Sequence, residues 1–218
     1  MFADVNGIRL YYEKSGCGQP IVLSHCNSMS HTIFKKAVKV LEKKFTVYNV
    51  DTRDHGKSTK VGTLHYEDMA EDMFQFITKL KIEKPIFYGF SDGGITGILL
   101  ASLHPDLLSK LIISGASLSP ESTKALPMAF FKLWSHVDSS DKMQIMMREP
   151  NITDDILKAI TVPTFVTCGS HDVIKESHSR HIAETIPDAT LKIFEGEGHS
   201  GYIMNSRKIA DYILDVTK

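Results

Sequence analysis

Ser91 is the residue of this chain whose surroundings most clearly fit a chemical role. It is the third residue of the pentapeptide GFSDG (residues 89–93), which has the pattern Gly-x-Ser-x-Gly. Apolar runs precede it from Ile86 and follow it from Ile95, so the sequence predicts a strand before the serine and a helix after it. Such a turn is typical of a nucleophile elbow, which exposes the serine hydroxyl beside a helix N-terminus. We therefore predict that Ser91 is a nucleophile rather than part of an ordinary tight turn.

A serine nucleophile requires a base within hydrogen-bonding reach and a carboxylate that orients the base. His199 lies in the loop after the last predicted strand, with glycines on both sides at positions 198 and 201. Asp172 follows the predicted strand that ends at Cys168, in a Gly-x-x-Asp turn. Both loops leave the same edge of the predicted sheet as the elbow, and the chain order serine, aspartate, histidine is typical of this architecture. The sequence therefore predicts that Ser91, Asp172 and His199 form a catalytic triad.

Other residues compete for the two supporting roles, because the chain contains ten histidines and many acidic residues. The alternatives are His25, His55 and His171 for the base, and Glu195, Glu197 and Asp211 for the acid. We favour His199 because it alone follows the last predicted strand between flanking glycines. A metal site could be assembled from His171, Asp172 and His178, or from His25 and Cys26. No H-x-E-x-x-H or CxxC spacing is present, so we predict neither a metal nor a cofactor.

The composition of the chain excludes several classes of function. Its 218 residues are 42% hydrophobic, which is ordinary for a single globular domain. Lys and Arg (25) nearly balance Asp and Glu (26), so we expect no nucleic-acid partner. No segment reads as membrane-spanning and no signal peptide is recognisable, so we expect a cytoplasmic protein with no membrane partner. Three cysteines without CxxC spacing indicate reduced thiols, and the oligomeric state stays open.

The pattern of apolar residues predicts the elements that must position the candidate triad. We expect strands at 8–13 (an edge strand), 21–24, 45–50, 86–89, 111–114, 164–168 and 191–194, and helices at 31–44, 66–80, 95–104, 176–185 and 207–216. Strands that alternate with helices favour an α/β fold with a mostly parallel sheet covered by helices on both faces. In such a sheet the functional residues gather at the carboxyl ends of the strands. We predict one domain over residues 1–218.

Residues 118–150 interrupt the alternation of strands and helices. The segment lies between two strands that we expect to be neighbours, and it is too rich in methionine and aromatic residues to be a linker. We predict that it forms a short helical lid with an apolar underside above Ser91, and we include Trp134 among the candidate substrate-binding residues. A short lid implies an open, shallow pocket and hence small or exposed acyl substrates.

With the elbow, acid and histidine in this order, the chain resembles the α/β-hydrolase family from about Gly7 to Val216. The segments that carry the resemblance are SHCN (24–27), DTRDHGKS (51–58), GFSDGG (89–94), GSHD (169–172) and GHS (198–200). The elbow is similar to that of the valacyclovir hydrolase, or biphenyl hydrolase-like, group. This similarity implies hydrolysis of a carboxylic ester without a cofactor.

The resemblance also implies a second donor to the oxyanion, besides the backbone N–H of Asp92 in the elbow. The family usually has His-Gly where this chain has His25-Cys26, and the donor is usually the residue after that glycine, which is Asn27 here. Because Cys26 replaces the glycine, Cys26 is an alternative donor and a candidate substrate contact. A second departure is Asp54, which stands where the family has glycine in a loop that is mostly structural.

The expected reaction is hydrolysis of a small-molecule ester through an acyl-serine intermediate. The same fold and triad also serve lactonases, amidases, C–C bond hydrolases and perhydrolases, and a slow-turnover ligand receptor is an alternative from another class. A haloalkane-type enzyme is disfavoured because the nucleophile position holds Ser91 and not aspartate. The carboxylate of Asp92 either pairs with a cation on the substrate or caps the following helix, and the sequence leaves both open.

Overall fold

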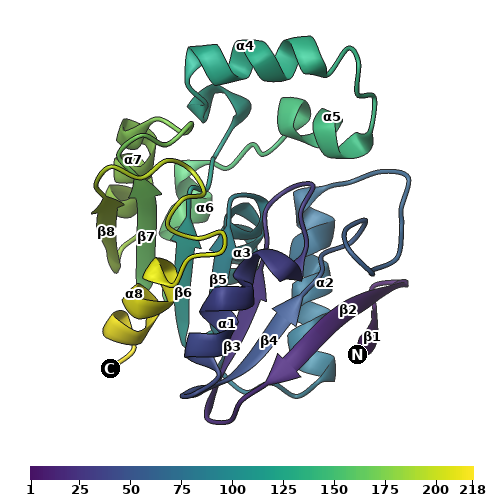
Figure 1. The fold of residues 1–218 in the computed structure, drawn as a ribbon, viewed down its shortest axis with the longest axis vertical. Helices are drawn as coiled ribbons and strands as arrows, with labels where there is room; N and C mark the ends of the chain where they lie inside the picture. The colour runs from purple at the N-terminus through teal and green to yellow at the C-terminus, as the bar shows by residue number, and fades with distance from the viewer.

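The computed structural model describes residues 1–218 and contains eight strands and eight α-helices, which alternate over residues 45–114 and 164–216 (Figure 1). The strands are β1 (Phe2–Val5), β2 (Ile8–Ser15), β3 (Gln19–Ser24), β4 (Phe45–Val50), β5 (Ile86–Phe90), β6 (Lys110–Ser114), β7 (Thr164–Gly169) and β8 (Ala189–Phe194). The helices are α1 (Lys35–Leu41), α2 (Tyr66–Lys79), α3 (Asp92–Leu103), α4 (Ala125–Trp134), α5 (Asp141–Arg148), α6 (Asp154–Lys158), α7 (Glu176–Thr185) and α8 (Lys208–Val216). Two short 3-10 helices, η1 (His31–Phe34) and η2 (Pro120–Ser122), complete the set.

All eight strands belong to one sheet, in the order β1-β2-β4-β3-β5-β6-β7-β8. The six strands from β4 to β8 in this order are parallel, whereas β1 and β2 pair antiparallel at one edge. The chain goes from β3 outward to β4 and then returns to place β5 on the other side of β3. Ligands of open α/β sheets bind at the carboxyl ends of the strands where the order reverses in this way. The predicted α/β fold class is confirmed.

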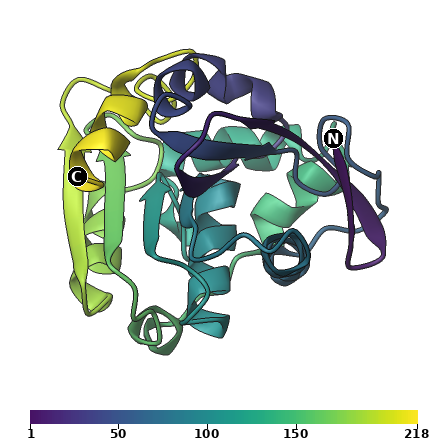
Figure 2. The ribbon, with the colours of Figure 1, turned by 90° about the horizontal axis from the view of Figure 1, so that it is seen from below.

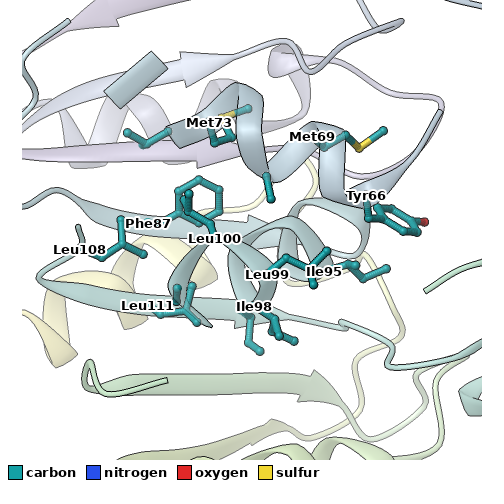
Figure 3. Close-up of a cluster of buried hydrophobic side chains, with 14 of the residues drawn as sticks. Tyr66, Met69, Met73, Phe87, Ile95, Ile98, Leu99, Leu100, Leu108 and Leu111 are labelled. Atoms are coloured by element: carbon teal, nitrogen blue, oxygen red, sulfur yellow. The ribbon is translucent and has the colours of Figure 1, made fainter. Parts of the chain in front are cut away.

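Helices cover both faces of the sheet (Figures 1 and 2). Helices α1 and α8 pack together on one face, and α2, α3, α6 and α7 lie on the other. Helix α3 is apolar around most of its circumference because it is enclosed between the sheet and α2. Figure 3 shows this packing, in which Leu100 of α3 lies beside Phe87 of β5, while Met69 and Met73 of α2 lie on the side of α3 opposite to Ile98. The base of α3 is therefore held firmly against β5, the strand that leads into it.

Three details differ from the sequence prediction. The edge strand is β1, and β2, which we expected at the edge, lies between β1 and β4. A turn at Asn6 and Gly7, both with positive φ, lets the short β1 fold back onto β2. The helix expected at 31–44 is divided into η1 and α1 and ends at Leu41, and α6 was not predicted.

The segment between β6 and β7 contains η2, α4 and α5, followed by α6, and α4 and α5 lie beyond one end of the sheet (Figure 1). Ile145 of α5 is fully buried in the main core, which anchors this helix to the rest of the molecule. Helix α4 has no buried residue. None of the helices combines the length and the hydrophobicity needed to cross a bilayer.

Candidate active site

Ser91 lies at a sharp turn, directly between β5 and α3. Its backbone has φ 54° and ψ −112°, and its N–H donates a 2.8 Å hydrogen bond to the carbonyl of Ser114 at the end of β6. Two glycines make the turn possible. A Cβ at Gly89 would lie 2.0 Å from the carbonyl oxygen of Gly93, and a Cβ at Gly93 would lie 2.2 Å from the carbonyl oxygen of Ser24. The Gly-x-Ser-x-Gly pattern is therefore a requirement of packing around the serine.

The structure brings Ser91, His199 and Asp172 together, although they lie on three loops. His199 Nε2 is 3.2 Å from Ser91 Oγ, and His199 Nδ1 is 2.7 Å from Asp172 Oδ1. Asp172 follows β7, and His199 follows β8. The side chain of His199 is 23% exposed, whereas that of Asp172 is 1% exposed. This arrangement is able to pass a proton from the serine to a histidine whose orientation is fixed by a carboxylate.

The environment of Asp172 favours its ionised form. Burial alone would raise the pKa of Asp172, but the hydrogen bond and the charge of His199 outweigh burial and lower the pKa. The N–H of Ile174 also donates to Oδ1, at 2.9 Å. The competing acids Glu197 and Asp211 instead form ion pairs with Lys208 and Arg207.

Asn27, Cys26 and Asp92 line the same cavity as Ser91, next to the serine hydroxyl. Asp92 is the first residue of α3, so its N–H has no acceptor within the helix and is available to an oxyanion. Cys26 is a poor nucleophile here, because burial and the nearby charge of Asp92 raise the pKa of its thiol to about 12. Both oxyanion-donor candidates of the loop, Asn27 and Cys26, are thus near the elbow.

The Asp92 side chain is 6% exposed and lines the cavity, and its Oδ2 atom has no hydrogen-bond partner. Burial raises the pKa of Asp92 to about 6, while Tyr66, Asn27 and His199 act in the opposite direction. The alternative that Asp92 caps the helix is wrong, because the N-cap position belongs to Ser91 and no backbone N–H bonds to the Asp92 carboxylate. A buried carboxylate with a free oxygen therefore lies beside the candidate nucleophile.

The cavity has a volume of about 270 Å³. It is lined by polar residues, which include the candidate triad residues Ser91 and His199, and by apolar residues that come mostly from the lid and the loop after β7. The apolar residues include Met128 and Phe131 of α4, Met146 and Met147 of α5, and Val173 and Ile174. Tyr66 and Glu149, which the sequence analysis did not single out, also line it. Nothing in their local sequence distinguishes them, because only the tertiary fold brings them to the site.

Trp134 does not reach this cavity. It lies at the end of α4, is 47% exposed and stacks on Phe130, with ring centroids 6.2 Å apart. The residues of α4 that line the cavity are Met128 and Phe131, and Trp134 lies about one turn further along the helix, at its end. The apolar underside that we expected of the lid is present, but Trp134 is not part of it.

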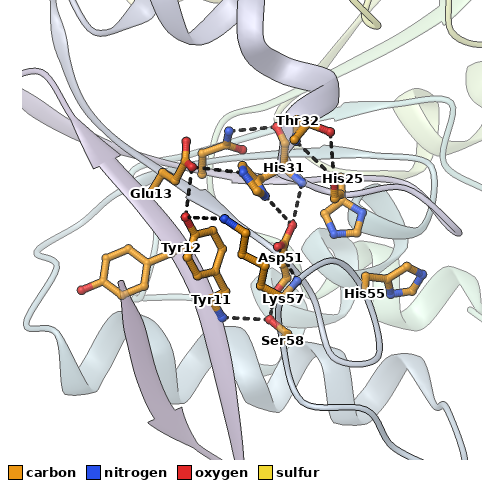
Figure 4. Close-up of polar contacts among 12 residues, drawn as sticks. Tyr11, Tyr12, Glu13, His25, His31, Thr32, Asp51, His55, Lys57 and Ser58 are labelled. Carbon is orange, nitrogen blue, oxygen red and sulfur yellow. Dashed lines mark hydrogen bonds and ion pairs between the residues drawn. The ribbon is translucent and has the colours of Figure 1, made fainter.

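Two loops lie beside the site: residues 25–30, which follow β3, and residues 51–58, which follow β4. A network of buried polar groups holds them in place (Figure 4). Asp51 Oδ1 accepts hydrogen bonds from the N–H and from Nδ1 of His31, both at 2.7 Å, and Asp51 Oδ2 accepts one from Lys57 N–H at 2.9 Å. His25 Nε2 accepts a hydrogen bond from Thr52 N–H at 3.1 Å. Burial and the neighbouring His55 lower the pKa of His25 to about 4, so His25 is neutral and acts as a fixed acceptor. These contacts give the histidines of the two loops a supporting role.

One group of side chains has the donor types of a metal site. The ligand atoms of His65, Glu67 and Glu149 lie within 4.8 Å of one another. His65 Nδ1 is already 2.6 Å from Glu149 Oε1, the His65 side chain is 45% exposed, and Glu67 is exposed. We interpret this group as an ion pair that ties the start of α2 to the end of the lid.

Comparison with known proteins agrees with the fold. The alpha/beta hydrolase fold family matches residues 19–143, which is more than half of the chain. The chain therefore belongs to the α/β-hydrolase fold family.

Its curated relatives include a putative esterase/lipase of Haemophilus influenzae, 25% identical over 194 residues that span 71% of this chain and 68% of that protein. The human serine hydrolase BPHL is 34% identical over 120 residues, 52% of this chain and 41% of that protein. The zebrafish (Danio rerio) sn-1-specific diacylglycerol lipase ABHD11 is 26% identical over 209 residues, 94% of this chain and 59% of that protein. The chain thus spans about half of the last two relatives, and the match to BPHL supports the resemblance of the elbow.

Solved structures share the fold over nearly the whole chain. An esterase from Exiguobacterium antarcticum superposes with a TM-score of 0.83 at 25% identity, covering 99% of this chain and 98% of that chain. An enol-lactonase from Burkholderia xenovorans LB400 superposes with a TM-score of 0.82 at 22% identity over 100% of both chains.

Proposed function

We propose that this protein is a serine hydrolase that cleaves small carboxylic esters through an acyl-Ser91 intermediate. The observation that carries the proposal is the continuous chain of contacts from Ser91 Oγ to His199 Nε2 (3.2 Å) and from His199 Nδ1 to Asp172 Oδ1 (2.7 Å). The esterases and lipases among its relatives support the same reaction class.

In this mechanism His199 removes the proton from Ser91 as the hydroxyl attacks the ester carbonyl. The tetrahedral oxyanion accepts hydrogen bonds from the N–H groups of Asp92 and Asn27. His199 then protonates the departing alcohol, and a water molecule, deprotonated by His199, attacks the acyl-serine and releases the acid. Asp172 stabilises the imidazolium in both halves of the reaction.

The cavity suggests the size and the chemistry of the substrate. A volume of about 270 Å³ with methionine and phenylalanine walls suits an acyl group of a few carbon atoms. The carboxylate of Asp92, buried beside Ser91 with Oδ2 unpartnered, suits an ester that carries an ammonium group. We therefore include aminoacyl-type esters in the proposed substrate class.

A lactonase is the second candidate, because an internal ester reacts at the same triad and one structural neighbour is an enol-lactonase. Amidase and C–C bond hydrolase activities would use the same residues, as would a receptor with slow turnover. Only turnover measurements distinguish these alternatives from an esterase.

The test is hydrolysis of p-nitrophenyl acetate by the wild type and by Ser91→Ala. We expect the variant to lose nearly all activity and to lose labelling by a fluorophosphonate probe. An undiminished rate in Ser91→Ala would overturn the proposal.

A panel of esters, lactones and amides then identifies the reaction. A comparison of aminoacyl esters with neutral esters in Asp92→Asn tests the ammonium subsite. Equal losses for both kinds of ester would remove that subsite from the proposal.

A further inference from the structure

Lys142 of the lid contacts both loops in which this sequence departs from the family pattern. Its Nζ atom lies 2.8 Å from Asp54 Oδ2, and its backbone carbonyl accepts a 2.8 Å hydrogen bond from Asn27 Nδ2. Asp54 stands in place of a family glycine, and Asn27 follows Cys26, which replaces another. The two departures therefore meet at one residue of the lid.

The backbone of Asp54 shows why the aspartate is informative. Its φ is 63°, in the left-handed region that glycine adopts most readily and that aspartate tolerates. The two side chains are partly buried, with Asp54 15% exposed and Lys142 24% exposed. Burial alone would raise the pKa of Asp54, but the hydrogen bond and the charge of Lys142 contribute to lowering it. The chain thus places a charged residue where glycine fits best, and that residue forms an ion pair with the lid.

The two loops are also bonded to each other. The N–H of Ser28 donates a 3.0 Å hydrogen bond to His55 Nε2, and Ser28 Oγ donates a 2.8 Å hydrogen bond to Asn27 Oδ1. His55 Nδ1 in turn lies 2.8 Å from the carbonyl of Arg53. Asn27, Ser28, His55, Asp54 and Lys142 therefore form one connected group that runs from the oxyanion loop to the lid.

Lys142 is part of α5, the lid helix that supplies Met146 and Met147 to the cavity. Ile145 of the same helix is fully buried, so α5 packs against the core in a fixed position. A displacement of α5 would change the wall of the cavity and would also pull on the side chain of Asn27. The position of the lid and that of the oxyanion loop are consequently coupled through Lys142.

We propose that Asp54 and Lys142 form a latch that positions the oxyanion loop against the lid, so that closing the cavity also aligns the backbone donor of Asn27. Both are positioning residues, since neither side chain lines the cavity. The proposal rests on the hydrolase function proposed above. Because small displacements of reacting groups lower rates strongly, loss of the latch should act on kcat more than on KM.

The kinetic test compares Lys142→Met, Asp54→Asn and the double variant with p-nitrophenyl acetate as substrate. We expect each single variant to lose about tenfold in kcat with KM changed less than about threefold. The double variant should be no slower than the singles, because one interaction is removed in all three. The matched control is Lys60→Met, because Lys60 Nζ donates to the backbone carbonyl of Asp54 at 2.6 Å and does not pair with its carboxylate. Its kcat should stay within about twofold of the wild type.

Asp54→Gly distinguishes positioning from a general effect on the fold. Glycine relieves the left-handed backbone, so we expect an unchanged or higher melting temperature together with the same loss of kcat. A residue that only stabilises the fold would instead lower the melting temperature without a selective fall in kcat.

Hydrogen exchange provides a readout that does not depend on turnover. In Lys142→Met we expect faster exchange in residues 26–30 and 141–148 and unchanged exchange in β5. This measurement remains informative if no ester is hydrolysed, so failure of the latch and failure of the proposed function are distinguishable. Unchanged exchange at residues 26–30, or an unchanged kcat in an enzyme whose activity depends on Ser91, would overturn the latch.

Discussion

Replacing Asp172 with asparagine should lower kcat while leaving the fold intact. Asp172 Oδ1 accepts hydrogen bonds from His199 Nδ1 at 2.7 Å and from Ile174 N–H at 2.9 Å. An asparagine oxygen in the same place can accept both, so the substitution removes mainly the negative charge. The new NH₂ group would occupy the position of Oδ2, which is buried and has no partner.

The size of the effect follows from the lost charge. A unit charge about 4 Å from the imidazolium, at an effective dielectric constant of about 20, contributes about 4 kcal/mol. Each 1.4 kcal/mol or so corresponds to about a tenfold change in rate, so kcat should fall about a thousandfold. The unpartnered NH₂ group should lower the free energy of unfolding by about 1–3 kcal/mol.

The assay is steady-state hydrolysis of p-nitrophenyl acetate, with urea denaturation as the measure of stability. Glu197→Gln is the matched control, because Glu197 lies in the loop of His199 and was a competing candidate, yet pairs with Lys208. Its kcat should change less than about threefold. The reasoning is refuted if Asp172→Asn keeps more than about a tenth of the wild-type kcat, or if Glu197→Gln loses as much as Asp172→Asn.

Three further predictions concern the elbow, the cavity and the lid. Gly93→Ala should destabilise the protein by more than about 3 kcal/mol or prevent folding, because its Cβ would meet the carbonyl of Ser24 at 2.2 Å, and urea denaturation measures the loss. The ratio of kcat/KM for ammonium-bearing esters to kcat/KM for neutral esters should be highest above the Asp92 pKa of about 6. It should decline as the pH falls below this pKa, because the Asp92 carboxylate becomes protonated. The ratio of kcat/KM values between pH 5 and 8 checks this, and Asp92→Asn should show no such dependence. Trp134→Ala should leave kcat/KM within about twofold of the wild type, because Trp134 does not line the cavity, whereas Phe131→Ala should raise KM.

The sequence was most informative where local chemistry is strict. The elbow could be placed from five residues because the backbone at Ser91 admits only glycine at positions 89 and 93. Asp172 and His199 could be placed because each directly follows a strand, and parallel strands end at the same edge of the sheet. The roles assigned to these residues stay predictions until activity is measured.

The walls of the cavity could not be predicted in the same way. Tyr66 and Glu149 are brought to the site by packing between distant segments, which leaves no mark on their immediate sequence. Trp134 was assigned to the pocket from its residue type, but α4 continues about one turn past Phe131, and the sequence does not show where along the helix the cavity ends. Strand β1 was missed because only two of its four residues, Ala3 and Val5, are buried, which is too short a pattern to recognise.

The backbone conformation of Ser91 sets stability against the proposed function. A non-glycine residue with φ 54° and ψ −112° carries a conformational strain of about 1–3 kcal/mol. Glycine at this position would relieve the strain, and Ser91→Gly should therefore be the more stable protein. Serine is therefore the less stable choice at this position, and the proposed role of its hydroxyl group as nucleophile gives a reason for it. Stabilising this protein by choosing residues that suit its backbone would, at Ser91, remove the proposed nucleophile.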